Sequence, residues 1–543
     1  MTQENTVVSR RSLWALAAVA FLLYIAGNSH TPLMDRDEPR FAQAAREMLR
    51  SGDFIVPHFN GEVRFDKPVL AYYFIAAGMG VFGPNEVGAR VASALFGALS
   101  VFVVFFLARR VLASEAKALL AAAFLASAPV MVVESKQCTV DALLLLLVLL
   151  SFTGLWRIYE GPCENKWKAL FWASLALGVL AKGPVAIAVA FGCVFLLVAI
   201  SRDRSFLGRM AWPWGIPLFI LIVAPWVLAV QERTAGEFLR VALGKHVIQR
   251  ASEPLESHRG FPGYYVLTFF VTMFPWAFFA PAALWNAVRG LRDKKKEIFL
   301  VAWAGGLVII LEIVETKMVH YSLPVFPAMA ILVADYLVGA LQSHDRRVIS
   351  AIASAMVLAV IMALGLPVFA FLYGMSAAVE PLAAAGVVLL AGMSWWLVVA
   401  RKWGPLSIGA GVAAVFAWLF VMASWAVPAL LSGNPSKEAA SLVAQARESL
   451  GSYATVALYE GYKEPSLVFY CDGALFPPAP RDLNELHAPG APDILVFSTK
   501  NRGMVELLQA SDFRYVGSAS GLNFAYGKPV RLSVWSRPPA RTE

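Results

Sequence analysis

The chain has 543 residues, of which 59% are hydrophobic and only 15% are charged, and its net charge is +9. Soluble globular proteins contain about a quarter charged residues, so this composition excludes a soluble enzyme, a fibrous protein and a disordered chain. Long apolar stretches recur between residues 13 and 427, and a stretch of about 18 residues can cross the roughly 30 Å hydrocarbon core of a bilayer. We therefore predict a polytopic α-helical membrane protein.

Thirteen apolar stretches are predicted to span the membrane. They are expected at residues 12–30, 87–108, 118–134, 141–157, 168–181, 184–200, 212–230, 263–287, 298–314, 321–340, 349–373, 380–400 and 405–431. Basic residues gather in alternate connecting loops, for example at 109–110, 289–296 and 346–347. By the positive-inside rule this alternation predicts a cytoplasmic N-terminus, and an odd number of spans then predicts an outer C-terminus. The net positive charge therefore indicates membrane topology and not nucleic-acid binding.

The chain is predicted to divide into a membrane domain at 1–432 and a small extracytoplasmic α/β domain at 433–543. Apolar density falls after residue 432, and prolines and glycines become frequent. Strands are expected at 454–458, 466–470 and 493–498, a helix at 502–510 and a final hairpin at 524–535. This tail has no glycine-rich phosphate-binding motif, so we interpret it as a supporting or docking module and predict no nucleotide cofactor.

The first outer loop, at 31–86, begins with an unusual concentration of charge. Three carboxylates and two arginines lie together there: Asp35, Arg36, Asp37, Glu38 and Arg40. Asp37 suits the cap of a helix that continues to Arg50, and Pro39 suits its first turn. Its apolar side chains fall on one face, which predicts an interfacial amphipathic helix on the membrane. A second helix is expected at 69–82. One carboxylate is enough for a cap, so the surplus points to a functional site.

Further ionisable residues lie at the predicted outer ends of the spans. They are Asp66, Lys67, Lys136, Asp141, Lys182, Lys245, His246, Arg250, His258, Lys317 and His320, with Tyr321 beside the last. Charge at membrane depth is costly, so such residues are functional candidates. A transporter would concentrate them near the bilayer midplane. Their gathering at one face instead predicts an active site or an anionic-ligand site.

Several motifs resemble those of a known enzyme family. They are Asp37-Glu38-Pro39-Arg40-Phe41-Ala42, Ser51-Gly52-Asp53, Pro57-His58-Phe59-Asn60-Gly61, Phe65-Asp66-Lys67-Pro68, Ala181-Lys182-Gly183-Pro184, Ile248-Gln249-Arg250 and Leu323-Pro324-Val325-Phe326-Pro327. This set resembles the protein-mannosyltransferase superfamily of C-type glycosyltransferases, and within it the bacterial lipid A 4-amino-4-deoxy-L-arabinose transferases. The resemblance implies the C-type glycosyltransferase fold.

The resemblance also implies an activity and a location. The expected reaction moves a sugar from an undecaprenyl (polyprenyl) phosphate carrier to an acceptor, most specifically 4-amino-4-deoxy-L-arabinose to lipid A, with inversion at the sugar carbon. The expected site is the periplasmic face of a bacterial inner membrane, with the C-terminus on the same side. Adding an amino sugar lowers the negative surface charge, so a role in antimicrobial peptide resistance is expected.

The resemblance assigns roles to individual residues. Asp37 would be the catalytic carboxylate, and Arg40, Lys67, Lys182 and Arg250 would surround and bind the donor's phosphate. A divalent metal, Zn²⁺ or Mg²⁺ or Mn²⁺, would be bound by Asp66 with His246 or His258. Asp66 replaces the glutamate that arabinose transferases usually carry there, so its carboxylate has a shorter reach. Further candidates for the substrate site are Asp141, Lys317 and Tyr321.

Three alternatives remain open at this stage. The same chemistry could act on a protein hydroxyl, a core oligosaccharide or another envelope glycan. A transporter or flippase of a lipid-linked sugar would require midplane charges and pseudo-symmetric halves, and the chain has no evident internal repeat. A scaffold without catalysis would not need Asp37 beside Arg40 on the outer face.

Overall fold

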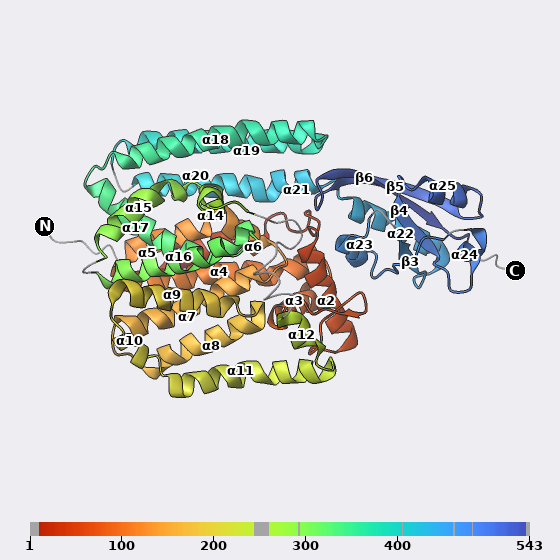
Figure 1. The fold of residues 1–543 in the computed structure, drawn as a ribbon. Coiled ribbons are helices and arrows are strands. Elements are labelled where there is room, and N and C mark those ends of the chain that lie inside the picture. Colours follow the sequence, from red (N-terminus) through yellow and green to blue (C-terminus); the bar gives the residue numbers. More distant parts are fainter. Residues whose placement is uncertain are drawn as a thin grey trace.

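The computed structural model describes residues 10–243, 260–291, 294–403, 406–459, 462–480 and 482–538. Helices packed side by side form most of the molecule, and a smaller α/β unit lies beyond one end of the helical bundle (Figure 1). Several helical elements are short, among them α10 (Ser205–Gly208), η3 (Trp276–Phe279), η4 (Val319–Val325) and η5 (Met422–Ala426). The polytopic helical class predicted from the composition is confirmed.

Each predicted span coincides with one or more helices. These are α1 (Arg10–Ile25), α4 (Glu86–Leu112), α5 (Glu115–Ala126), α6 (Pro129–Lys136), α7 (Asp141–Glu160), α8 (Asn165–Lys182), α9 (Val185–Ser201), α11 (Trp212–Arg233), α14 (Tyr264–Thr272), α15 (Ala280–Arg289), α16 (Lys295–Ile313), α17 (Phe326–Gln342), α18 (Arg347–Leu372), α19 (Ser376–Ala400), α20 (Leu406–Val421) and α21 (Val427–Leu431). Hydropathy thus placed the apolar segments at the right positions along the chain.

Fewer helices than the thirteen predicted spans are long and apolar enough to cross a membrane alone. Within the described residues seven helices meet that condition, or eight if α5 and α6, which bend by 61° at their junction, form one span. Proline explains two of the interruptions, because it cannot continue a helix and suits a first turn. Pro129 begins α6, and Pro275 lies in the break between α14 and η3.

The helices differ in how much protein covers them. The apolar window of α7 is 78% buried within the protein, whereas those of α11 and α18 are only 17% buried. In Figure 1 α11 and α18 form opposite edges of the bundle. Their exposed side chains, such as Leu221 and Phe371, are apolar, as expected of surfaces that contact lipid chains. The protein core therefore lies around α5, α7 and α17.

The first outer loop forms α2 (Asp37–Ser51), β1 (His58–Phe59), β2 (Glu62–Val63) and α3 (Leu70–Phe82), and α12 (Glu237–Leu243) lies nearby. Both predicted helices are present, but two details differ. Asp37 is the first helical residue and not the cap, since the cap is Arg36, which makes no side-chain capping bond. The polar Gln43 and Arg46 are also as buried as Phe41, so protein encloses α2 on more than one face.

A buried ion pair fixes the start of α2. The Arg90 guanidinium on α4 donates to both carboxylate oxygens of Glu38, at 2.8 and 2.7 Å, and both side chains are only 2% exposed. Arg90 also donates to the carbonyl oxygens of Asn28, Thr31 and Pro32. Glu38 in turn accepts from the backbone amides of residues 34 and 138. One pair therefore joins the first outer loop, α4 and the turn before α7.

The C-terminal unit contains α22 (Pro435–Leu450), β3 (Val456–Leu458), α23 (Pro465–Tyr470), α24 (Leu483–His487), β4 (Ile494–Ser498), α25 (Arg502–Gln509), β5 (Arg514–Asn523) and β6 (Lys528–Ser536). Its sheet has the order β3-β4-β6-β5, in which only β3 and β4 are parallel. The first and third predicted strands and the helix at 502–510 are confirmed. The final hairpin begins earlier than predicted, at Arg514.

The strand predicted at 466–470 is wrong, because this segment is helix α23. Pro465 occupies its first turn, where a proline stabilises a helix. Residues 465–469 are all buried, and a short run buried on every side carries no periodicity that separates a helix from a strand.

Helix α23 and the turn after it dock onto the first outer loop. The Asp35 carboxylate accepts from the amide and the hydroxyl of Ser466, at 2.8 and 2.5 Å. The Leu33 amide donates to the Tyr470 hydroxyl at 2.8 Å. Three further contacts join the same surfaces: Arg46 to the Phe469 carbonyl at 2.9 Å, Arg50 to Asp472 at 2.7 Å, and Asn60 to Ala474 at 2.7 Å. The C-terminal unit thus holds the residues on both sides of Asp37.

We expect Arg90→Met to destabilise the protein far more than Arg109→Met on the same helix. Removing Arg90 strands the Glu38 carboxylate in a buried site, which costs about 3 to 5 kcal/mol. Arg109 pairs with Glu115 at 3.0 Å but is 52% exposed, and exposed pairs contribute at most about 1 kcal/mol. Melting temperatures of the detergent-purified proteins measure the difference. Equal shifts in the two variants would contradict this role of Arg90.

Asp35 should make the stability of the protein fall as the pH rises. Burial raises the pKa of Asp35 to about 6, although the Ser466 hydrogen bonds oppose this effect. Its contribution to stability is therefore fully present below about pH 4 and is lost as the pH rises through 6, by roughly 3 kcal/mol in all. Asp35→Asn should remove this component, so melting curves of the variant from pH 4 to 8 should be flatter.

Asp472→Asn is the matched control for Asp35→Asn, because the expected sign is opposite. Burial alone would raise the pKa of Asp472, yet Arg50 and Arg46 hold it below its usual value. The wild-type contribution of Asp472 is then present at neutral pH and is lost as the pH falls. The same pH trend in both variants would contradict the assignment of either carboxylate.

Candidate functional site

Asp37 is the most exposed carboxylate of the charged cluster that opens α2. The side chain of its neighbour Glu38 is buried, and Asp35 is partly buried. Within the described residues the Asp37 carboxylate has no hydrogen bond or ion pair, but it lies within electrostatic range of Arg64 and His320. A carboxylate that is positioned by a rigid helix start and remains accessible can accept a proton from an incoming hydroxyl.

Asp66 and Lys67 lie close to Arg64 in the segment that leads into α3. One Asp66 oxygen is 2.9 Å from the Arg64 guanidinium and the other is 3.2 Å from the Lys67 amine. Arg64 also donates to the Tyr72 hydroxyl at 2.8 Å. Burial alone would lower the pKa of Arg64, but its interactions with Tyr72 and Asp66 raise it above the usual value. Lys67 is therefore a cation held in place beside a balancing carboxylate.

Asp141 and Lys182 come from the ends of two adjacent helices. Asp141 is the first residue of α7 and Lys182 is the last residue of α8. Their charged groups are 2.5 Å apart, and their side chains are 8% and 11% exposed. The Lys182 amine also lies over the Tyr321 ring, 5.2 Å from its centre. Three predicted residues, distant in sequence, are thus in contact.

His320 links these two groups of charges. It lies within electrostatic range of Asp37, Lys67, Asp141 and Lys182. Those four residues come from α2, the segment before α3, α7 and α8. The structure therefore brings together four of the predicted site residues, with Tyr321 beside them.

Arg40 and Lys317 are placed differently. Arg40 lies within electrostatic range of Asp35, one helical turn after Asp37. The Lys317 amine is committed elsewhere, because it binds Glu312 at 2.8 Å and two backbone carbonyls, and its side chain is only 4% exposed. In this structure Lys317 is therefore paired with Glu312.

Three predicted residues lie outside the described part of the chain, and two of them are predicted metal ligands. These are Arg250, His246 and His258. In the part that is described, no three histidine, cysteine or acidic side chains come together as a metal site. Asp66, the remaining predicted ligand, is already paired with two cations. The described residues thus do not fit a metal ion, and no step of the reaction is derived through one.

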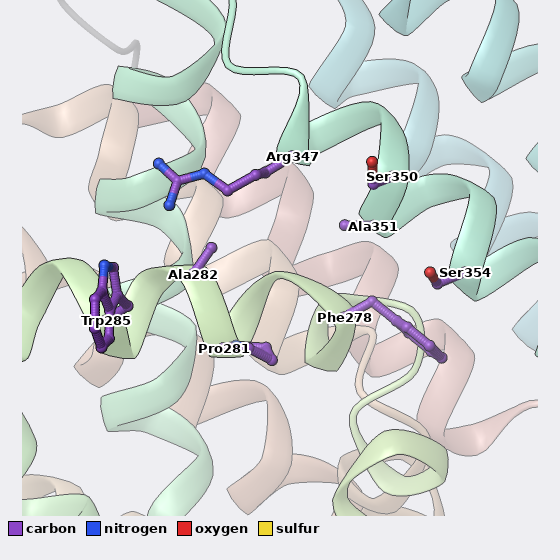
Figure 2. Close-up of a pocket in the computed structure, with 8 residues that line it drawn as sticks. All are labelled: Phe278, Pro281, Ala282, Trp285, Arg347, Ser350, Ala351 and Ser354. Atoms are coloured by element: carbon purple, nitrogen blue, oxygen red, sulfur yellow. The ribbon is translucent and has the colours of Figure 1, made fainter.

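A groove of about 520 Å³ lies away from these charges, between η3–α15 and α18 (Figure 2). Trp285, Pro281 and Phe278 line one wall, and residues of α18 line the other. Arg347 is the ionisable residue of the lining, and its guanidinium binds Asp345 at 2.7 Å. The groove has no carboxylate in its lining that could act as a base.

Sequence reasoning assigned no role to Arg90, Arg64 or Glu134. Arg90 could have been found, because it is a charged residue inside a predicted span, where charge is costly. Glu134 lies buried on α6 within electrostatic range of Asp141 and Lys182 and accepts from the Thr139 hydroxyl at 3.3 Å. A bend between α5 and α6 brings it there, and Pro129 at that break does not indicate which residues the bend brings together.

Residues 11–236 match the family described as dolichyl-phosphate-mannose-protein mannosyltransferase. Over 349 residues the chain is 31% identical to an undecaprenyl phosphate-alpha-4-amino-4-deoxy-L-arabinose arabinosyl transferase of Pseudomonas paraeruginosa, covering 62% of each chain. It is 30% identical over 329 residues to the transferase of the same name from Edwardsiella ictaluri, covering 60% of this chain and 59% of that one. The chain thus spans about 60% of the length of these curated relatives.

The fold has a counterpart among solved structures. The crystal structure of ArnT from Cupriavidus metallidurans bound to undecaprenyl phosphate matches with a TM-score of 0.83 at 22% identity, covering 97% of this chain and 98% of that one. An Archaeoglobus fulgidus oligosaccharyltransferase in complex with Zn and sulfate matches with a TM-score of 0.53 at 14% identity, covering 91% of this chain and 69% of that one. The resemblance and the fold predicted from the motifs are thereby confirmed.

Proposed function

We propose that this chain is a glycosyltransferase that uses a polyprenyl-phosphate sugar as donor, because residues 11–236 match the dolichyl-phosphate-mannose-protein mannosyltransferase family. One observation carries the proposal. An accessible carboxylate, Asp37, and two amines held in place, Lys67 and Lys182, come from separate segments of the chain and lie around one histidine. A base for a hydroxyl and cations for a phosphate are the two requirements of this transfer.

In the proposed step the acceptor hydroxyl gives its proton to the Asp37 carboxylate. The hydroxyl oxygen forms a bond to the anomeric carbon, and the bond from that carbon to the phosphate oxygen breaks with its electron pair. The products are a glycosylated acceptor and a polyprenyl phosphate. Direct displacement of this kind inverts the configuration at the sugar carbon, an expectation that rests on analogy with the family.

Lys67 and Lys182 would neutralise the charge that develops on the leaving phosphate. Each amine is already held by a carboxylate, at 3.2 Å from Asp66 and 2.5 Å from Asp141. Cations fixed in this way need little reorganisation when the leaving group forms, and this is the main advantage of a preorganised site. Arg40, one turn after Asp37, and Arg250 are proposed to complete the phosphate site.

We further propose 4-amino-4-deoxy-L-arabinose as the sugar and lipid A as the acceptor. The names of the Pseudomonas and Edwardsiella relatives support this choice of sugar. The proposal places the chain in a bacterial inner membrane, with the N-terminus in the cytoplasm and the site and the unit at 433–543 in the periplasm. The residues at 1–432 would then form the membrane domain.

A protein or another envelope glycan is the second candidate acceptor, since the matched family is named for transfer to protein. A transporter is less well supported. Asp37 and Asp141 are the first residues of their helices and Lys182 is the last of its own, whereas a transport site is expected near the middle of broken helices.

Asp37→Asn should abolish transfer while leaving the protein folded. The amide cannot take up the hydroxyl proton, and loss of a general base typically costs 10²- to 10⁴-fold in rate. Mass spectrometry of lipid A and envelope glycans from expressing cells measures the product, with Glu62→Gln, an exposed carboxylate of the same loop, as the matched control. A mass gain on lipid A in wild type that is absent in Asp37→Asn supports both proposals.

Two other outcomes of that experiment are informative. A mass gain on a different glycan or on protein would keep the chemistry and replace lipid A as acceptor. If Asp37→Asn forms the same product as wild type, Asp37 is not the catalytic base, and the transport hypothesis has to be tested instead.

Lys67→Met should weaken binding of the donor lipid. The Lys67 side chain is 16% exposed and its amine pairs with the Asp66 carboxylate, which is itself 24% exposed. The substitution therefore deletes a cation without leaving a fully buried carboxylate unpaired. A charge-assisted hydrogen bond contributes about 1.5 to 3 kcal/mol, so the dissociation constant of undecaprenyl phosphate should rise about tenfold or more. Lys166→Met is the control, since Lys166 is 62% exposed and lies at the other end of α8. Equal affinities for Lys67→Met and wild type would exclude Lys67 from the phosphate site.

A further inference from the structure

His320 has a position that its sequence context does not explain. It is the second residue of η4, which packs against α6, α7 and α16. Its ring meets the Tyr321 ring edge-on, with centres 4.9 Å apart and planes at 89°. The Lys182 amine also lies over the Tyr321 ring, 5.2 Å from its centre. One tyrosine therefore contacts both the histidine and a predicted phosphate-binding lysine.

Both lysines near His320 are paired with carboxylates and not with its ring. Lys182 binds Asp141, and Lys67 binds Asp66. Across the described ranges neither ring nitrogen of His320 takes part in a hydrogen bond, although the side chain is partly buried. The side chain is only partly buried, so its ring nitrogens, which have no partner among the described residues, are open to bind water or a ligand.

The surroundings also define what kind of group the ring could bind. His320 lies within electrostatic range of the proposed base, Asp37, and of both proposed phosphate-binding amines, Lys67 and Lys182. In a transfer reaction the reacting sugar lies between the acceptor hydroxyl and the departing phosphate. A neutral imidazole offers one N–H donor and one acceptor nitrogen, so it can donate to an anion without adding a fixed charge beside the lysines.

We infer that His320 is a further catalytic residue of the proposed reaction, whose ring N–H donates a hydrogen bond to the phosphate oxygen that leaves the sugar. This inference rests on the proposed function. The carbon–oxygen bond breaks with its electron pair on that oxygen, while the acceptor proton goes to Asp37. No proton leaves the imidazole, so the step balances without another reactant. The two lysines share their charge with carboxylates, and His320 supplies the uncommitted donor.

The test compares His320→Gln, whose amide can still donate, with His320→Phe, which keeps a ring but cannot donate. His30→Phe is the control, because His30 is an exposed histidine in the loop just before α2. Turnover is measured on the full-length protein in lipid nanodiscs. Losing one donor to a developing oxyanion typically costs 10²- to 10³-fold in kcat. We expect His320→Phe to lose about 100-fold, His320→Gln to retain at least a tenth of wild-type turnover, and His30→Phe to match wild type.

Undecaprenyl phosphate binding, measured on the same samples, separates this inference from the proposed function. We expect its dissociation constant to rise at least about fivefold in His320→Phe and less in His320→Gln. If wild type transfers no sugar, the proposed function fails, and weaker binding by His320→Phe alone would still support a phosphate contact. Wild-type binding together with unchanged turnover in His320→Phe would overturn the inference. Equal losses of turnover in the Gln and Phe variants, with unchanged binding, would overturn it too.

Discussion

The buried pair between Glu38 and Arg90 is the contact on which the rest of the site depends. It joins the start of α2, the α4 helix and the turn before α7 within a few ångströms. Burying an ion pair costs desolvation free energy, which is offset only when all donors and acceptors of the pair are hydrogen-bonded. Here three carbonyls accept from Arg90 and two amides donate to Glu38. That requirement fixes the backbone on either side of Asp37 without using Asp37 itself, so the proposed base keeps its carboxylate available.

Other charged residues near the proposed site are paired in the same way. Lys67 and Lys182 each have a carboxylate partner, and Asp35 is held by α23 from the C-terminal unit. The unit at 433–543 therefore does more than cover the bundle, because it orders the loop that carries the proposed base. This contact gives a physical role to a unit that has no recognisable catalytic motif. Its contact is also sensitive to pH through Asp35, whose burial raises its pKa.

The parts of this structure that sequence predicts well are those governed by one-dimensional patterns. Apolar length placed a helix at each predicted span, and the charge alternation placed Asp37, Lys67, Asp141 and Lys182 on one predicted face of the membrane. The failures lie where three-dimensional packing decides: α23 is a helix because Pro465 starts it, although its buried run suits a strand equally. The sequence analysis gave no role to Arg90 inside an apolar run, and it did not predict that Lys317 pairs with Glu312. The proposed role of His320 could not be predicted from its local sequence, because it depends on neighbours from four other segments.

The most direct test of the central claim is to locate the donor phosphate. An undecaprenyl phosphate analogue with a photoreactive diazirine beside the phosphate can be crosslinked to the full-length protein and mapped by peptide mass spectrometry. We expect labelling of the peptides that contain Lys67, Lys182 and His320, and we expect unlabelled undecaprenyl phosphate to reduce that labelling. Labelling confined to the groove between α15 and α18, or labelling that competitor does not reduce, would contradict it.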